Sequence, residues 1–236
     1  MNRFRLDARA VLAVTLASLL VADEGGISAQ SPQSQPLVQA GNVVHLGVIN
    51  APNGAGLGAG PNGMAVDGNT WYFGCNSAGV AVLTLPPLGG TAQVTSPCTA
   101  FPNIDQVHPT DRRVVTGGVL PWLGRVVTSA YVYYDGSALG AKSHWAGANV
   151  ASLSGPYKVG TDRAGMVGGY MGAIPPEWRA LLGGPALTGQ CCIPIIGRSS
   201  FGPSVSVFDP ADLGVQATIS STMLIGYPIE HQNLGR

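Results

Sequence analysis

The sequence predicts an all-β fold of the β-propeller kind, with about three blades and no long helix. Two observations lead to this prediction. Glycine occurs 34 times and proline 18 times in 236 residues, and such frequent punctuation suits short strands joined by tight turns. Runs rich in β-branched and aromatic residues also begin at similar intervals, near Gly63, Gly117 and Gly165.

The N-terminus has the features of a secretory signal. Three arginines precede an apolar run at residues 10–22, and Ser28 and Ala29 offer a cleavage point before Gln30. The apolar run is shorter than the roughly 20 residues that cross a bilayer. We therefore expect residues 1–29 to be a signal peptide and residues 30–40 an unstructured leader. The mature chain would be secreted or periplasmic with no membrane span; a retained anchor or an uncleaved signal is the alternative.

The first group of predicted strands comprises residues 43–50, 63–66, 70–75 and 79–85. The turn centred on Gly68 joins the second and third of these strands into a hairpin. The fourth ends before Pro86, which has no N–H for a sheet ladder.

The second group comprises residues 114–121, 125–134, 144–153 and 157–159. A turn at Leu123 and Gly124 joins the first two. The run at 125–134 is the longest, and its valines and tyrosines suit a half-buried pleated strand.

The third group comprises residues 165–167, 191–196 and 204–208. A short helix at 175–182 interrupts this group. It begins with two prolines and is followed by Gly183 and Gly184, which is the expected order at the two ends of a helix.

The repeat spacing carries the propeller prediction. The starts at Gly63, Gly117 and Gly165 are 54 and 48 residues apart, a spacing typical of blades with several strands each. A closed propeller has 4–8 blades, so we expect residues 41–236 to be part of a longer propeller. A fourth, partial blade from the chain ends is one alternative, and an irregular β-sandwich is another.

Several stretches resemble a group of uncharacterised bacterial secreted proteins. These stretches include SAYVYYDGS, SHW, VGGYMGAIPPEWRALLGG, SVSVFDPADLGV and YPIEHQNLG. The resemblance covers residues 117–235 and is most specific at 170–214. It implies export and a propeller-like β fold in chains longer than this one, and it implies no activity.

Four cysteines follow the predicted signal peptide: Cys75, Cys98, Cys191 and Cys192. In an oxidising compartment an even number favours two disulfides, for which three pairings exist. Cys75 and Cys98 flank the first strand group, so we expect one bridge between them. Cys191 and Cys192 would form a strained vicinal ring, stay as thiols or bridge elsewhere. The spacing does not fit zinc, so no metal is expected.

Charge and motif patterns narrow the function classes. Without residues 1–29 the chain keeps nine basic and nine acidic residues, 12 − 3 of each, so we expect no nucleic-acid partner. The glycine-rich stretches at 58–63 and 136–143 approach dinucleotide and phosphate motifs. Because no helix is predicted after either, no cofactor is expected.

The ligand-binding candidates are Asp135, His144 and Trp145. Trp145 follows a polar loop and is the best candidate among the aromatic residues for an exposed ring that stacks on a sugar; the alternative is that it fills the core. Other acids belong to turn-like strings, where Asp bends the backbone: Asp67, Asp111, Asp209 and Asp212. Asp135, Asp162 and Glu230 remain as free acids, and no catalytic residue is assigned.

These features favour an extracellular binding or structural module for a carbohydrate or a protein. The alternative is a secreted glycan-active hydrolase of propeller architecture. A hydrolase needs two carboxylates across a sugar bond, within about 10 Å of each other. A binding module presents polar and aromatic groups without such a pair.

Overall fold

The computed structural model describes residues 32–34, 36–53, 56–57, 63–111, 113–133, 135, 139–190 and 203–226. Within these residues the protein is mainly β, as predicted. The chain divides into two compact units, Met1–Val38 and Gln39–Arg236. In the first, the described part includes the 3-10 helix η1 (Pro32–Ser34), and all described strands belong to the second. Across the described ranges, no helix has the length and hydropathy to span a membrane.

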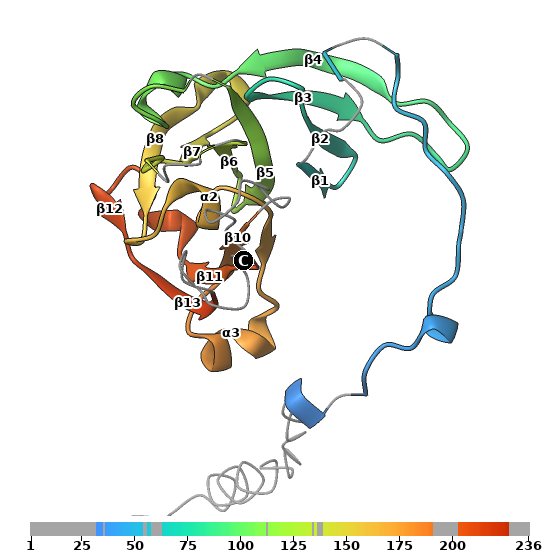
Figure 1. Cartoon of the computed structure of the whole chain (residues 1–236). Coiled ribbons are helices and arrows are strands. Elements are labelled where there is room, and N and C mark those ends of the chain that lie inside the picture. The colour runs from blue at the N-terminus through green and yellow to red at the C-terminus, as the bar shows by residue number, and fades with distance from the viewer. Residues whose placement is uncertain are drawn as a thin grey trace, which may run out of the picture. The chain divides into compact units, whose positions relative to one another are not determined.

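Sheet 1 is an antiparallel meander of β1 (Met64–Asp67), β2 (Thr70–Gly74), β3 (Gly79–Thr84) and β4 (Gln93–Ala100) (Figure 1). The predicted hairpin is confirmed: Asp67 pairs with Thr70, and Gly68 takes the positive φ of 54° that the tight turn requires.

Two predictions at sheet 1 were incomplete or wrong. β4 was not predicted. It contains Pro97, but it is an edge strand and its register with β3 shifts at this point, where a proline is tolerated. The strand expected at 43–50 is absent. After the 3-10 helix η2 (Ala40–Asn42), only Asn50 forms a bridge, to Thr91, because the preceding residues have no neighbouring strand.

Sheet 2 contains the meander β5 (Val114–Trp122), β6 (Arg125–Val132), β7 (His144–Gly147) and β8 (Ser154–Val159). The short strand β12 (Thr218–Ile219) adds to β8 in parallel. The strand expected at 144–153 is shorter than predicted. It ends at Gly147, and the chain then forms the 3-10 helix η4 (Val150–Ser152), whose first turn is capped by Asn149.

Sheet 3 is the antiparallel order β13-β11-β10-β9, with β9 (Met171–Ala173), β10 (Ala186–Gly189), β11 (Val205–Phe208) and β13 (Ser221–Ile225). The predicted helix is α3 (Pro176–Leu182), which ends at Gly183 with φ 84°. The prediction of a strand at 165–167 was wrong. The chain must reverse there between β8 and β9, and one helical turn, α2 (Ala164–Val167), makes the reversal with all four residues buried. The strand expected at 191–196 lies outside the described residues.

Sheet 2 packs on both of its faces because side chains alternate along each strand. One face meets sheet 1 in a core that includes Val80, Val126 and Trp145. The other meets sheet 3 in a core that includes Val127, Ala186 and Phe208. The sheets therefore follow one another in chain order, with sheet 2 between the other two.

Glycines let the beginnings of the three sheets approach closely. A Cβ on Gly63 would lie 3.0 Å from the Cα of Gly118, and one on Gly117 would overlap the carbonyl of Gly168. Gly117 is the extra residue of a bulge in β5. β5 consequently lies beside both β1 and β9. Of the three starts predicted from the sequence, Gly63 directly precedes β1, Gly117 lies inside β5 three residues after its start, and Gly165 lies in α2.

Cys75 and Cys98 form a disulfide with a Cα–Cα distance of 6.2 Å. It belongs to a third apolar cluster on the outer face of sheet 1, together with Trp71, Ala81 and Leu83. Cys191 and Cys192, for which a vicinal ring was one expectation, lie outside the described residues.

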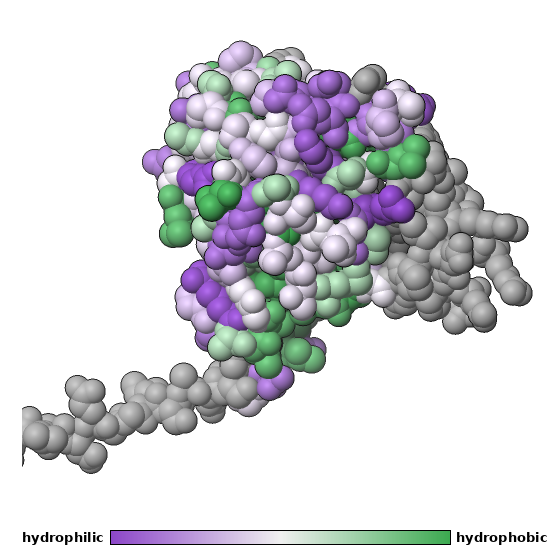
Figure 2. All heavy atoms as spheres, turned by 90° about the vertical axis from the view of Figure 1, so that its left-hand side faces the viewer, coloured by the Kyte–Doolittle hydropathy of each residue, from purple (hydrophilic) through white to green (hydrophobic). Residues whose placement is uncertain are grey.

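The surface seen in Figure 2 mixes hydrophilic and hydrophobic residues over most of its height. A hydrophobic group lies near the lower end of this surface. Leu181 of α3 is half-exposed.

Candidate functional site

Trp145 is fully buried, so of the two alternatives for its ring the core position is the one that the structure has. Its ring packs against Phe101 with 4.8 Å between centroids, and its Nε1–H donates to the carbonyl of Pro102 at 2.8 Å. The polar loop before it leads into β7, an inner strand of a sheet covered on both faces. Trp145 therefore stabilises the core between sheets 1 and 2 and offers no surface for a sugar.

His144 is also fully buried, but on the opposite face of β7, toward sheet 3. Its Nε2 lies 3.0 Å from Oγ1 of Thr188, and its Nδ1 lies 2.9 Å from Oγ of Ser143. Because the Thr188 hydroxyl donates to the carbonyl of Val167, it accepts from Nε2, and this assigns the neutral tautomer with its proton on Nε2. Burial lowers the pKa of His144 to about 3. His144 is thus a neutral side chain whose hydrogen bond to Thr188 joins sheet 2 to sheet 3.

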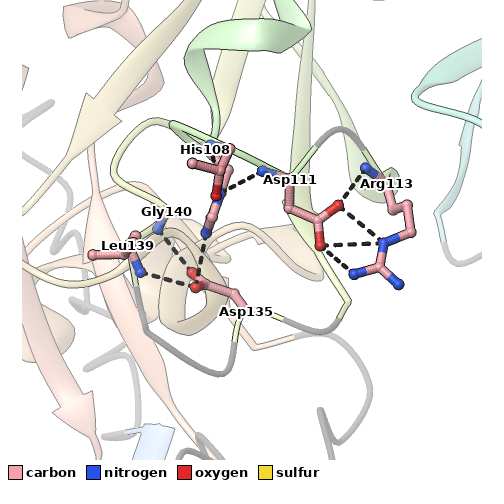
Figure 3. Close-up of polar contacts among 7 residues, drawn as sticks. His108, Asp111, Arg113, Asp135, Leu139 and Gly140 are labelled. Carbon is pink, nitrogen blue, oxygen red and sulfur yellow. Dashed lines mark hydrogen bonds and ion pairs between the residues drawn. The ribbon is translucent and has the colours of Figure 1, made fainter.

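Asp135 lies buried after β6 and accepts three hydrogen bonds (Figure 3). The backbone N–H groups of Leu139 and Gly140 donate to its two oxygens, each at 2.8 Å. The third bond comes from Nε2 of His108 at 3.1 Å. Asp135 therefore joins the loop between β4 and β5 to the loop between β6 and β7.

The His108–Asp135 pair is built as a structural clamp. Nδ1 of His108 accepts from the N–H of Asp111 at 2.9 Å and from that of Thr110 at 3.2 Å. Both ring nitrogens are therefore occupied within the protein, and His108 has no nitrogen left to take a proton from a substrate.

An ion pair at the surface continues this group, as Figure 3 shows. Arg113 donates from its guanidinium to both carboxylate oxygens of Asp111. These hydrogen bonds hold the pKa of Asp111 at about 2, below its ordinary value. The backbone N–H of Arg113 also donates to Asp111 at 2.8 Å, so this aspartate bends the chain, as its turn-like sequence indicated.

The three predicted ligand-binding residues do not form one site. His144 and Trp145 are neighbours in sequence but point to opposite faces of sheet 2, because adjacent residues in a strand alternate. Asp135 is engaged in the clamp with His108. Of the other two free acids, Glu230 lies outside the described residues. Asp162 lies near Ser221: a Cβ on Gly160 would overlap Oγ of Ser221 and lie 3.6 Å from the Asp162 carboxylate.

An open cavity of about 300 Å³ lies at the side of sheet 3. Its wall comes from three places in the chain: the turn after α3, the end of β11 with the residues after it, and the start of β13. It is lined by Gly183, Gly184, Pro185, Val207, Phe208, Asp209, Asp212, Ser220, Ser221 and Thr222.

The polar groups of this cavity are mostly available to a ligand. One oxygen of Asp209 accepts the N–H of Ala211 at 2.9 Å and caps the 3-10 helix η6 (Pro210–Asp212). Within the described part of the chain, by contrast, the Asp212 carboxylate makes no hydrogen bond. The same holds there for the hydroxyls of Ser220, Ser221 and Thr222. Four unpaired polar groups therefore converge on one depression.

Sequence reasoning missed this cavity. Asp209 and Asp212 were both set aside as turn residues, which is right for Asp209, whose carboxylate caps η6. Asp212 is the last residue of the same helical turn, and its carboxylate takes no part in the cap. The sequence had no signal that Asp212 would meet the 220–222 stretch, because β12 separates them and leads the chain across to sheet 2.

Among the described residues, no group of three His, Cys, Asp or Glu side chains is arranged to hold a metal ion. Comparisons of the chain with protein families, with curated proteins and with solved structures found no match.

Proposed function

We propose that this chain is an exported binding module of propeller type whose cavity at sheet 3 takes a carbohydrate. Four features support the architecture. Each sheet contains four antiparallel strands in chain order, the sheets pack face to face in chain order, and their first strands lie side by side. The resemblance of residues 117–235 to exported proteins of propeller-like fold points the same way. On this proposal each sheet is one blade, and the chain belongs to a longer propeller.

Export is supported by two independent features. The basic, apolar and small residues of the first 29 positions follow the order of a secretory signal. The disulfide between Cys75 and Cys98 is of the kind that persists in oxidising compartments.

The convergence of unpaired polar groups on the sheet 3 cavity carries the proposal of a carbohydrate ligand. Every sugar hydroxyl is both a donor and an acceptor, and serine and threonine hydroxyls match it in both roles. The Asp212 carboxylate accepts only, and a hydrogen bond from a sugar hydroxyl to it is charge-assisted. Pro185 is partly exposed and gives the cavity an apolar contact for the C–H face of a sugar ring, while Val207 and Phe208 are buried beneath it.

The cavity holds two carboxylates, which is the feature that favours the hydrolase alternative. A glycosidase uses one carboxyl group as acid and the other as nucleophile or base. One oxygen of Asp209 accepts the Ala211 N–H, which fixes this carboxylate as the cap of η6. With Asp212 as the single unengaged carboxylate of this cavity, binding without hydrolysis is the better supported function.

A glycan array followed by calorimetric titration tests this proposal. We expect a saccharide to bind, and we expect Asp212→Asn and Ser221→Ala to weaken its binding at least about tenfold, since each removes a hydrogen-bonding partner. Asp67→Asn, at an exposed acid on the distant β1–β2 hairpin, is the matched control and should bind like the parent. Binding that survives both cavity variants would contradict the site. Release of reducing ends that depends on Asp212 would establish the hydrolase alternative instead.

A further inference from the structure

The segment at residues 43–48 has the sequence pattern of a strand, but among the described residues it pairs with no strand. Val44, Leu46 and Val48 alternate with other residues and so share one side of an extended chain. Their exposed fractions are 72%, 78% and 58%. In the described part of the chain, the backbone N–H groups of residues 44–47 make no hydrogen bond.

The residues that follow hold this segment in place beside sheet 1. The N–H of Gly89 donates to the carbonyl of Val48 at 2.6 Å. Asn50 donates to Gly90 at 2.9 Å and accepts from Ala92 at 2.8 Å. These bonds fix residues 48–50 as a short parallel addition next to the β3–β4 turn. The 43–48 segment therefore extends from residues 48–50, which are hydrogen-bonded to sheet 1 at residues 89–92.

Sheet 3 has an edge strand, β13, whose exposed side chains are apolar like those of the 43–48 segment. Among the described strands β13 lies at the edge of this sheet, and Met223, Leu224 and Ile225 on it are 40%, 40% and 50% exposed. Leu224 has no Cα partner on β11, because Met223 pairs with Ser206 and Ile225 with Val205. Neither β13 nor the 43–48 segment contains a charged residue or a proline, which are the usual devices that block pairing between exposed strand edges.

We propose that the 43–48 segment of one copy pairs with the β13 edge of a second copy. Pairing within one chain is disfavoured because the segment is anchored at sheet 1, β13 belongs to sheet 3, and sheet 2 lies between these sheets. Each copy thus has a donor segment at one side and an acceptor edge at the other. Such a contact is head-to-tail, so it builds rings or chains rather than a closed two-fold dimer. Backbone hydrogen bonds supply the affinity, and the apolar side chains set the register.

Light scattering coupled to size-exclusion chromatography tests this assembly on the full mature chain, over about a hundredfold range of concentration. We expect the mass to rise with concentration in the parent. Leu46→Lys in the donor segment and Leu224→Lys in the acceptor edge should each abolish this rise, because a charge would be buried in the new sheet. Leu123→Lys, at an 86% exposed leucine of the β5–β6 turn, is the matched control and should assemble like the parent.

Mixing the two variants separates head-to-tail pairing from other modes. The Leu46→Lys chain keeps its acceptor edge, and the Leu224→Lys chain keeps its donor segment. We expect the mixture to form a one-to-one dimer and nothing larger. A parent that stays monomeric at every concentration would overturn the proposal. So would variants that assemble like the parent, or a mixture that stays monomeric.

Discussion

Asp135 accepts three hydrogen bonds in a buried position, two from the backbone and one from His108. We predict that Asp135→Asn lowers the free energy of unfolding by about 2–4 kcal/mol. The new amide N–H₂ would face an N–H donor wherever it points, and one buried donor would lose its acceptor. Urea denaturation measures this change.

Asp111→Asn is the matched comparison for the clamp. Its partner Arg113 is largely exposed, and surface ion pairs contribute about 0–1 kcal/mol. We expect a loss within that range. Equal losses for the two variants would contradict the assignment of the His108–Asp135 pair as the clamp that joins two loops.

His144 makes the stability of the fold depend on pH. Burial lowers its pKa to about 3, whereas in the unfolded chain an ordinary histidine takes up a proton near pH 6.5. Between these values the unfolded state binds more protons, so the contribution of His144 is complete above about pH 6.5 and is lost as the pH falls toward 3. At pH 5 the loss is about 2 kcal/mol.

The measurement is the free energy of unfolding at pH 7.5 and at pH 5 for the parent and for His144→Gln. The parent should lose about 2 kcal/mol more than the variant over this interval. The comparison of differences removes the contribution of other titrating groups. The same pH dependence in both proteins would show that His144 does not remain neutral in the fold.

At the scale of single residues, the sequence singled out side chains that make specific polar contacts, but it did not predict where they point. His144 and Trp145 were identified as a pair, and each makes specific polar contacts. That both side chains are buried depends on β7 being an inner strand of a sheet that is covered on both faces. That property is set by sheets 1 and 3, which are far away in the sequence.

At the scale of elements, β5 approaches β1 and the chain before β9 closely at Gly63, Gly117 and Gly118. Adding one methyl group at Gly117 tests this close approach. A Cβ on Gly117 would overlap the carbonyl of Gly168. We predict that Gly117→Ala destabilises the protein by about 1–3 kcal/mol, the usual cost of overpacking. Thermal unfolding reports the loss.

Gly172→Ala is the control for the junction. Gly172 lies in β9 with nothing within 4 Å of a Cβ built on it, so this variant should be neutral or more stable by about 0.5 kcal/mol. A Gly117→Ala protein as stable as the Gly172→Ala protein would contradict the close approach of β5 to the chain before β9.

The disulfide ties the end of sheet 1 together across 23 positions of sequence. The chain-entropy relation gives a loop of this size a stabilisation of about 3 kcal/mol. We predict that replacing both Cys75 and Cys98 by serine lowers the free energy of unfolding by about that amount, measured by urea denaturation without reductant. An unchanged value would show that these two cysteines are not bonded in the folded protein.

At the scale of elements, hairpins were predictable where turn chemistry is local, as at Gly68 and Gly124. The strands that were missed depend on partners. β4 contains Pro97 and is stabilised by β3, while β9 has only three residues and is held by β10. The reverse error at residues 43–50 has the same cause, because a strand-like sequence without a partner does not form a sheet.

At the scale of the whole molecule, the repeat spacing predicted three similar units, and the described residues form three sheets, each with four antiparallel strands in chain order. Glycines allow the three sheets to approach one another, because a Cβ at Gly63 or Gly117 would crowd or overlap the backbone of the next sheet's first segment. The cavity could not be predicted, because its wall joins residues 183–185, 207–212 and 220–222, and no local pattern links these stretches.

Hydrogen–deuterium exchange of the full mature chain, with and without the saccharide that it binds, tests the central proposal most directly. A carbohydrate in the sheet 3 cavity should slow exchange in peptides that cover residues 183–185, 207–212 and 220–222, and leave those of sheet 1 unchanged. Protection confined to sheets 1 and 2, or no protection at saturating saccharide, would contradict the proposed function.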